Sequence, residues 1–125
     1  MPIIHIYSPL ASPPAGLLES MCAKVTRHLE LPEGYMWAMW QELKPGNFLR
    51  PNWVHGATRN GPIAIVYCKT TYTTEQVAGM LTIIRDSFVD ALGCKSEDVY
   101  TAAQRVHPGE VMGRGEIWRD DPSPG

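Results

Sequence analysis

The feature of this sequence that most constrains its fold is a run of residues that occurs twice. Residues 2–7, Pro-Ile-Ile-His-Ile-Tyr, return as residues 62–67, Pro-Ile-Ala-Ile-Val-Tyr. Both runs begin with proline and are rich in β-branched and aromatic residues, which is typical of β-strands. Because an internal repeat limits the possible architectures more than single-residue propensities do, we interpret the chain as two copies of one structural plan.

A helix is predicted after each of these strands. After the first, residues 12–14, Ser-Pro-Pro, are a helix-start signal, and apolar residues then recur at helical spacing up to Leu29. This pattern predicts a helix of about four turns. After the second strand, Thr73 and Gln76 have the spacing of a capping box, and the apolar stripe that follows stops at Gly93. The second helix therefore matches the first.

A further strand is expected after each helix, over residues 35–42 and 99–106. Both segments end alike: Gln, Pro and Gly occur at matching positions within residues 41–46 and 104–109. A strand, a helix and a strand joined in this order form a right-handed parallel unit. We therefore predict an α+β fold in which two β-α-β units make one four-stranded sheet, with both helices on one face.

The repeats divide a single domain into segments. The first repeat spans residues 2–46, the connector 47–61 and the second repeat 62–118, and the tail over 119–125 is expected to be frayed.

The sheet face away from the helices is predicted to be apolar and uncovered. Trp37, Met39, Ile65 and Tyr67, or the residues that alternate with them, must point away from the helices. Because a domain usually needs two packed layers, we expect the chain to form a homo-oligomer.

Composition excludes several classes of protein. The 125 residues are 44% hydrophobic and 19% charged, which is ordinary for one globular domain that folds without disulfides or a metal. The net charge of −2 provides no basic surface for nucleic acid. Cys22, Cys68 and Cys94 are widely spaced, without a CxxC pair, and the sequence shows neither a basic leader nor a long apolar run. These features predict a cytoplasmic protein that does not enter a membrane.

Pro2 is the residue most informative about function. It directly follows the initiator Met1, which is commonly removed before so small a residue, and removal would expose a secondary amine. The reference pKa of an α-amino group is ~7.7–8.0, and an apolar site or a neighbouring cation would lower it. Such an amine can act as a general base or acid near neutral pH. If Met1 is retained, the nitrogen is an amide and carries no chemistry.

The order and spacing of these motifs resemble the tautomerase superfamily, whose members are built from β-α-β units and use an amino-terminal proline as catalyst. The resemblance covers nearly the whole chain. It is carried by residues 1–7, the repeat at 62–67, Thr-Thr-Glu-Gln at 73–76 and Gly-Arg-Gly at 113–115. Two fused units resemble the long-chain branches, which include malonate semialdehyde decarboxylase and cis-3-chloroacrylic acid dehalogenase. The resemblance implies the tautomerase/MIF-like fold and a homotrimer, which would cover the open sheet face.

The resemblance also implies site residues, beginning with Pro2 as the catalyst. In these two branches the loop that opens the second helix carries two arginines for the substrate carboxylate, whereas residues 69–72 here are Lys-Thr-Thr-Tyr. Lysine binds a carboxylate as a point charge, whereas arginine binds it through two hydrogen bonds. Lys69, Tyr72 and Arg114 are therefore the candidate substrate-binding residues, and Arg114 lies in a Gly-Arg-Gly turn like one in the decarboxylase branch. Other candidate cations are Arg27, Arg50 and Arg59.

The resemblance implies two further candidates for substrate binding. The dehalogenase-like branch uses a histidine on the first helix, which corresponds to His28, although His28 also falls on the apolar stripe and is equally explained as a core histidine. Trp37 stands where single-unit members carry an arginine. The tyrosine and glutamate of the dehalogenase-like branch align with Ala102 and Gly113, so dehalogenation is not supported.

These residues predict an enzyme without a cofactor or a metal, since the sequence has no phosphate-binding loop and no metal-ligand spacing. Pro2 would move a proton on a small keto, enol or unsaturated carboxylic acid while Lys69 or Arg114 holds the carboxylate. Keto-enol tautomerisation, an isomerase reaction, needs the fewest groups. The alternative reactions are hydration or decarboxylation of a small three-carbon acid, which are lyase reactions. The alternatives without catalysis are a trimeric binding or interaction module and a small-molecule carrier, and Lys69 is alternatively an ordinary solvated lysine.

Overall fold

The computed structural model describes residues 2–50 and 61–119. Residues 51–60 of the predicted connector, with Arg59, and residues 120–125 of the predicted tail lie outside the described residues, as does Met1. The elements in chain order are β1 (Ile3–Ser8), α1 (Leu17–His28), β2 (Trp37–Glu42), β3 (Ile63–Lys69), α2 (Thr74–Leu92), the short 3-10 helix η1 (Ser96–Asp98), β4 (Tyr100–Val106), β5 (Met112–Gly113) and β6 (Glu116–Ile117).

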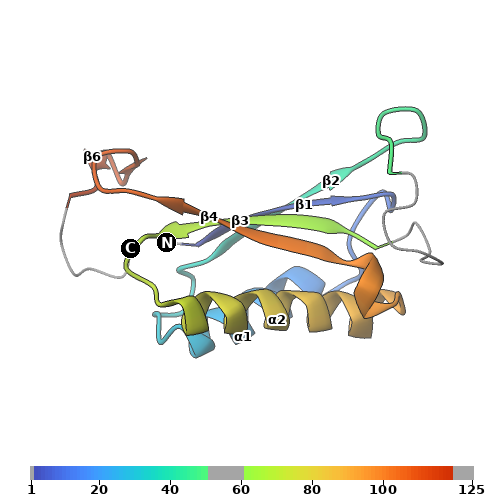
Figure 1. The fold of residues 1–125 in the computed structure, drawn as a ribbon, viewed down its shortest axis with the longest axis horizontal. Helices are drawn as coiled ribbons and strands as arrows, with labels where there is room; N and C mark the ends of the chain where they lie inside the picture. The colour runs from blue at the N-terminus through green and yellow to red at the C-terminus, as the bar shows by residue number, and fades with distance from the viewer. Residues whose placement is uncertain (1, 51–60, 120–125) are drawn as a thin grey trace.

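The main sheet has four strands in the order β2-β1-β3-β4. β1 is parallel to β2 and β3 is parallel to β4, whereas β1 and β3 pair antiparallel at the centre. Figure 1 shows α1 and α2 side by side against the same face of this sheet. The predicted α+β architecture of two β-α-β units with both helices on one face is therefore confirmed.

Alternation along the strands separates a buried face from an open one. Ile4, Ile6, Ala64 and Val66 face the helices and form a core with Met21, Val25, Met80, Ile84 and Phe88, all of them essentially inaccessible to solvent. On the opposite face, the side chains of Trp37 and Met39 are 55% and 47% exposed. The prediction of an uncovered apolar face is confirmed.

The start of α1 corrects the sequence prediction. The helix begins at Leu17, after Gly16 in the left-handed conformation (φ 82°), and its 12 residues make about three turns. The Ser-Pro-Pro run at 12–14 remains outside it, because a proline disfavours helical backbone at the preceding residue. The Pro14 carbonyl instead accepts a hydrogen bond from the Leu17 N–H in a turn.

The predicted signals of α2 are confirmed. The Thr73 hydroxyl accepts a hydrogen bond from the Gln76 N–H, and the Gln76 side chain accepts one from the Thr73 N–H. Gly93, with φ 68°, ends the helix. The hairpin of β5 and β6 was not predicted, since each strand has only two residues. Among the described helices, none is long and apolar enough to cross a membrane.

Candidate active site

Pro2 lies at one end of the sheet, directly before β1, and is fully buried. Its carbonyl accepts a hydrogen bond of 3.1 Å from the Trp37 N–H, which holds it against the start of β2. On the other side, Ile3 pairs with Tyr67, and continuing this antiparallel register by one residue places Cys68 opposite Pro2. Pro2 therefore lies between the start of β2 and the end of β3.

Lys69 is at this same end because it is the last residue of β3. Its side chain is only 5% exposed, and its Nζ lies 4.9 Å from the centre of the Trp118 ring, a cation–π distance. The indole N–H of Trp118 is also buried and makes no hydrogen bond within the described residues. Lys69 is thus a covered strand residue rather than a solvated loop lysine.

Arg105 of β4 holds the loop that carries Tyr72. Its Nη1 donates to the carbonyl oxygens of Thr70 at 3.3 Å and Tyr72 at 2.5 Å. Tyr72 packs against the core, and burial, with Cys68 nearby, raises the pKa of its hydroxyl. The sequence analysis did not select Arg105. The signal that identifies it is an arginine in register with Cys68, on the strand face that points toward the helices.

Cys68 is the thiol nearest to Pro2 in the strand register. Burial raises its pKa, and the positive charge of Arg105 acts in the opposite direction. A thiol is a nucleophile only as the thiolate, so a raised pKa makes the Cys68 thiol less reactive.

Arg114 reaches the same end of the molecule from the β5–β6 hairpin, which Figure 1 shows beyond the end of β4, where β1 begins. The Cζ atom of Arg114 lies 5.1 Å from the centre of the Tyr35 ring. Arg114 and Gly115 form the two-residue turn of the hairpin, with φ of 54° and 80°. The hairpin therefore contacts Lys69 through Trp118 at its base and Tyr35 through Arg114 at its tip.

The two remaining predicted residues lie in different layers. Trp37 begins β2, and its side chain is on the open face of the sheet. His28 ends α1, and its Nε2 lies 3.0 Å from the Gln76 carbonyl oxygen in the first turn of α2. A Cβ atom on Gly79 would clash with the His28 ring, so the ring packs directly on the α2 backbone. His28 thus joins the two helices.

The alternative cations are not gathered with Pro2. Arg50 lies near the start of β3, at the opposite end of the sheet, and donates to the carbonyl oxygens of Gly61 and Asp98 at 2.6 and 2.5 Å. Burial lowers the pKa of Arg50, and the neighbouring Asp98 counteracts this. Arg27 is exposed on α1.

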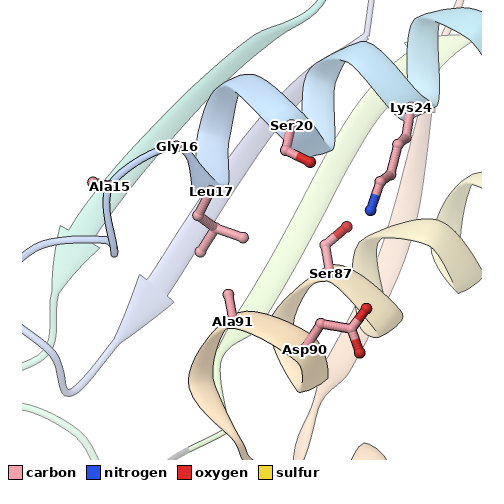
Figure 2. A pocket seen from close by; sticks show the side chains of 8 residues that line it. All are labelled: Ala15, Gly16, Leu17, Ser20, Lys24, Ser87, Asp90 and Ala91. Atoms are coloured by element: carbon pink, nitrogen blue, oxygen red, sulfur yellow. The ribbon is translucent and has the colours of Figure 1, made fainter.

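A hollow of about 240 Å³ lies between the first half of α1 and the last turns of α2. Figure 2 shows the Lys24 side chain of α1 pointing across it toward Ser87 and Asp90, which both belong to α2. It lies at the end of the helices away from Pro2, and none of the predicted site residues lines it. Within residues 2–50 and 61–119, no group of three or more His, Cys, Asp or Glu side chains is placed to hold a metal ion.

The two β-α-β units form one mixed sheet, and several solved structures have this same fold. A fused 4-OT described as a symmetric trimer is 15% identical, with 93% of this chain and 94% of that chain covered and a TM-score of 0.77. Macrophage migration inhibitory factor from Oncomelania hupensis is 18% identical over 94% of this chain and 82% of its own (TM-score 0.75). Malonate semialdehyde decarboxylase is 15% identical over 90% and 92% (TM-score 0.73).

These neighbours are tautomerase superfamily proteins, and the likeness shows that the chain has the fold of that superfamily. No protein-family model and no curated protein matches the sequence.

Proposed function

We propose that this chain is a cofactor-independent enzyme in which the Pro2 amine, freed by removal of Met1, moves a proton on a small keto or enol carboxylic acid. The observation that carries the proposal is the burial of Pro2 at the same end of the sheet as the buried cation Lys69. The likeness in fold to a fused 4-OT and to malonate semialdehyde decarboxylase supports an enzyme of this kind.

Burial and charge both favour a neutral amine at Pro2. Removing an amine from water disfavours its charged form, and a nearby ammonium group such as Lys69 has the same effect. Once Met1 is removed, both effects would act to lower the pKa of the Pro2 amine from the reference range of ~7.7–8.0.

The proposed reaction conserves the transferred proton. The Pro2 nitrogen accepts the hydroxyl proton of the enol, and the resulting ammonium donates a proton to the neighbouring substrate carbon, which gives the ketone and the free amine. Lys69 and Arg114 are the proposed cations for the carboxylate and for the negative charge that develops on the substrate oxygen. One acid/base group and one anion site are sufficient.

Hydration is less well supported than tautomerisation because it also needs a base for water. Glu110 is a carboxylate that follows β4, but its Oε2 accepts a hydrogen bond of 3.0 Å from the His107 N–H. In that hydrogen bond the Glu110 carboxylate caps a backbone N–H of its own loop. Tautomerisation requires no such residue.

We further propose that the chain is a homotrimer. Trp37, Met39 and Tyr100 leave 55%, 47% and 39% of their surface exposed on the open sheet face, and packing of three copies through these faces would supply the missing second layer. The fused 4-OT with this fold is described as a trimer. Light scattering should give three times the chain mass, and Met39→Glu should lower it; a wild-type monomer would contradict the proposal.

The function is tested by comparing Pro2→Ala with Pro62→Ala. Pro62 is also buried, and its carbonyl accepts a hydrogen bond of 3.1 Å from the Tyr100 N–H, but its nitrogen lies within the chain. Ketonisation of phenylenolpyruvate, followed by absorbance, should fall about 10²-fold or more in Pro2→Ala. Pro62→Ala should retain most of the activity. A wild-type rate in Pro2→Ala would contradict the proposal.

A further inference from the structure

We propose that Tyr35 is a positioning residue that holds the Arg114 guanidinium at the Pro2 end of the sheet, where Arg114 binds the substrate carboxylate. The inference rests on the proposed function, because it assigns the carboxylate contact of the same site. It also assigns Lys69, the more deeply buried cation, to the reacting end of the substrate.

The first observation is the backbone conformation at Arg114. Arg114 and Gly115 are the central residues of a two-residue hairpin turn, and both have positive φ, 54° and 80°. Glycine, asparagine and aspartate favour such turns, because a larger side chain in the left-handed region has a conformational cost. The turn would form more easily with a second glycine at position 114. The backbone therefore gives no reason for an arginine there.

The second observation is where the side chain goes. The Arg114 Cζ lies 5.1 Å from the centre of the Tyr35 ring, within the range of a cation–π contact. Among the described residues, the Arg114 side chain forms no ion pair. A guanidinium stacked on a ring keeps the N–H groups at its edge free, and these bind a carboxylate through two parallel hydrogen bonds.

The third observation is the position of this contact relative to Pro2. Tyr35 is two residues before Trp37, whose N–H donates to the Pro2 carbonyl. The same hairpin contacts Lys69 through Trp118. The hairpin thus extends from the end of β3 to the segment before β2. In the sheet, β1 lies between β2 and β3, and Pro2 directly precedes β1. A carboxylate on Arg114 would direct the rest of a small acid toward Pro2 and Lys69.

The decisive experiment measures stability, turnover and binding in four variants. Arg114→Gly should raise the Tm by a few degrees, because it relieves the left-handed conformation, and should raise the KM for phenylenolpyruvate about tenfold with a smaller change in kcat. Tyr35→Leu should raise KM severalfold. Tyr35→Phe should keep a near wild-type KM, because a phenyl ring still stacks on the guanidinium. Arg27→Gln, which removes an exposed arginine from α1, is the matched control and should change neither the Tm nor the KM.

Calorimetric binding of phenylpyruvate separates this inference from the proposed function. If Pro2→Ala abolishes turnover but Tyr35→Leu and Arg114→Gly bind phenylpyruvate like the wild type, the role of Tyr35 and Arg114 is overturned and the function stands. If binding depends on Arg114 and Tyr35 but the wild type has no turnover, the proposed function fails and this inference stands. Equal losses in Tyr35→Phe and Tyr35→Leu, or no binding by the wild type, would also overturn the inference.

Discussion

The two ends of the sheet are built alike, but only one of them carries the proposed chemistry. Pro2 and Pro62 are both buried and both precede a central strand. Each carbonyl accepts a hydrogen bond of 3.1 Å from the first residue of the neighbouring parallel strand, Trp37 in one unit and Tyr100 in the other. The repeat in the sequence therefore corresponds to a repeat in backbone geometry.

The ends differ in the groups around the proline. In the first unit, Pro9 occupies the position that Lys69 occupies in the second. The end of the sheet that holds Pro62 therefore has no charged side chain at that position. Each end has an arginine that binds two backbone carbonyls, Arg105 near Pro2 and Arg50 near Pro62. The repeat therefore accounts for the shared backbone geometry, and the proposed function depends on the side chains that differ between the two copies.

The largest expected effect comes from blocking the Pro2 nitrogen. A glutamate inserted between Met1 and Pro2 keeps the nitrogen in an amide, which makes the Pro2 end chemically equivalent to the Pro62 end. Turnover of phenylenolpyruvate should fall by about 10²–10⁴-fold, the usual contribution of a general acid/base. The circular dichroism spectrum and the mass measured by light scattering should remain those of the wild type. Undiminished turnover in a variant that retains the extra residue would show that the two ends do not differ in this way.

Removing the cation at the Pro2 end should have the next largest effect. Lys69→Met should lower kcat/KM about 10- to 100-fold, because a hydrogen bond to a charged group contributes roughly 1.5–3 kcal/mol. Lys69→Arg should recover part of the loss. Lys24→Met, which removes an exposed lysine from α1, is the control for general charge effects. An unchanged kcat/KM in Lys69→Met would assign the anion site elsewhere.

The two arginines that bind backbone carbonyls should separate stability from activity. Arg105→Met and Arg50→Met each leave two carbonyls without their donor, and each should lower the free energy of unfolding by about 1–3 kcal/mol in urea titrations. Only Arg105→Met should also raise KM, because Arg105 holds the loop that carries Tyr72. The account of the loop would be contradicted by an equal change in KM in both variants.

The smallest expected effect concerns the contact between the helices. Gly79→Ala should be neutral or slightly destabilising with His28 present, because the new Cβ meets the His28 ring. In a His28→Ala background, the same substitution should stabilise the protein by about 0.5–1 kcal/mol, since alanine is the better helix former. Thermal unfolding of the four proteins in this cycle measures the difference. An identical effect of Gly79→Ala in both backgrounds would show that the ring does not pack on Gly79 in solution.

The parts of the fold that were predicted from the sequence have local signals. Runs rich in β-branched and aromatic residues predicted β1 and β3, and the capping box and Gly93 predicted α2. The start of α1 was missed because the proline signal at 12–14 outweighed Gly16, whose turn delays the helix to Leu17.

The candidate site was only partly predictable, because its members depend on contacts far apart in the chain. Pro2 follows from its place after Met1, and Lys69 from the end of its strand. The stacking of Arg114 on Tyr35 and of Lys69 on Trp118 depends on where the short β5–β6 hairpin folds, which no local pattern specifies.

The most direct test of the central claim is an intact-mass measurement on the purified protein, made on the same sample whose turnover of phenylenolpyruvate is measured. The account predicts that the active protein lacks the mass of one methionine, so that Pro2 carries a free amine. An active protein that retains Met1 throughout would contradict the account, because the Pro2 nitrogen would then be an amide, as it always is at Pro62.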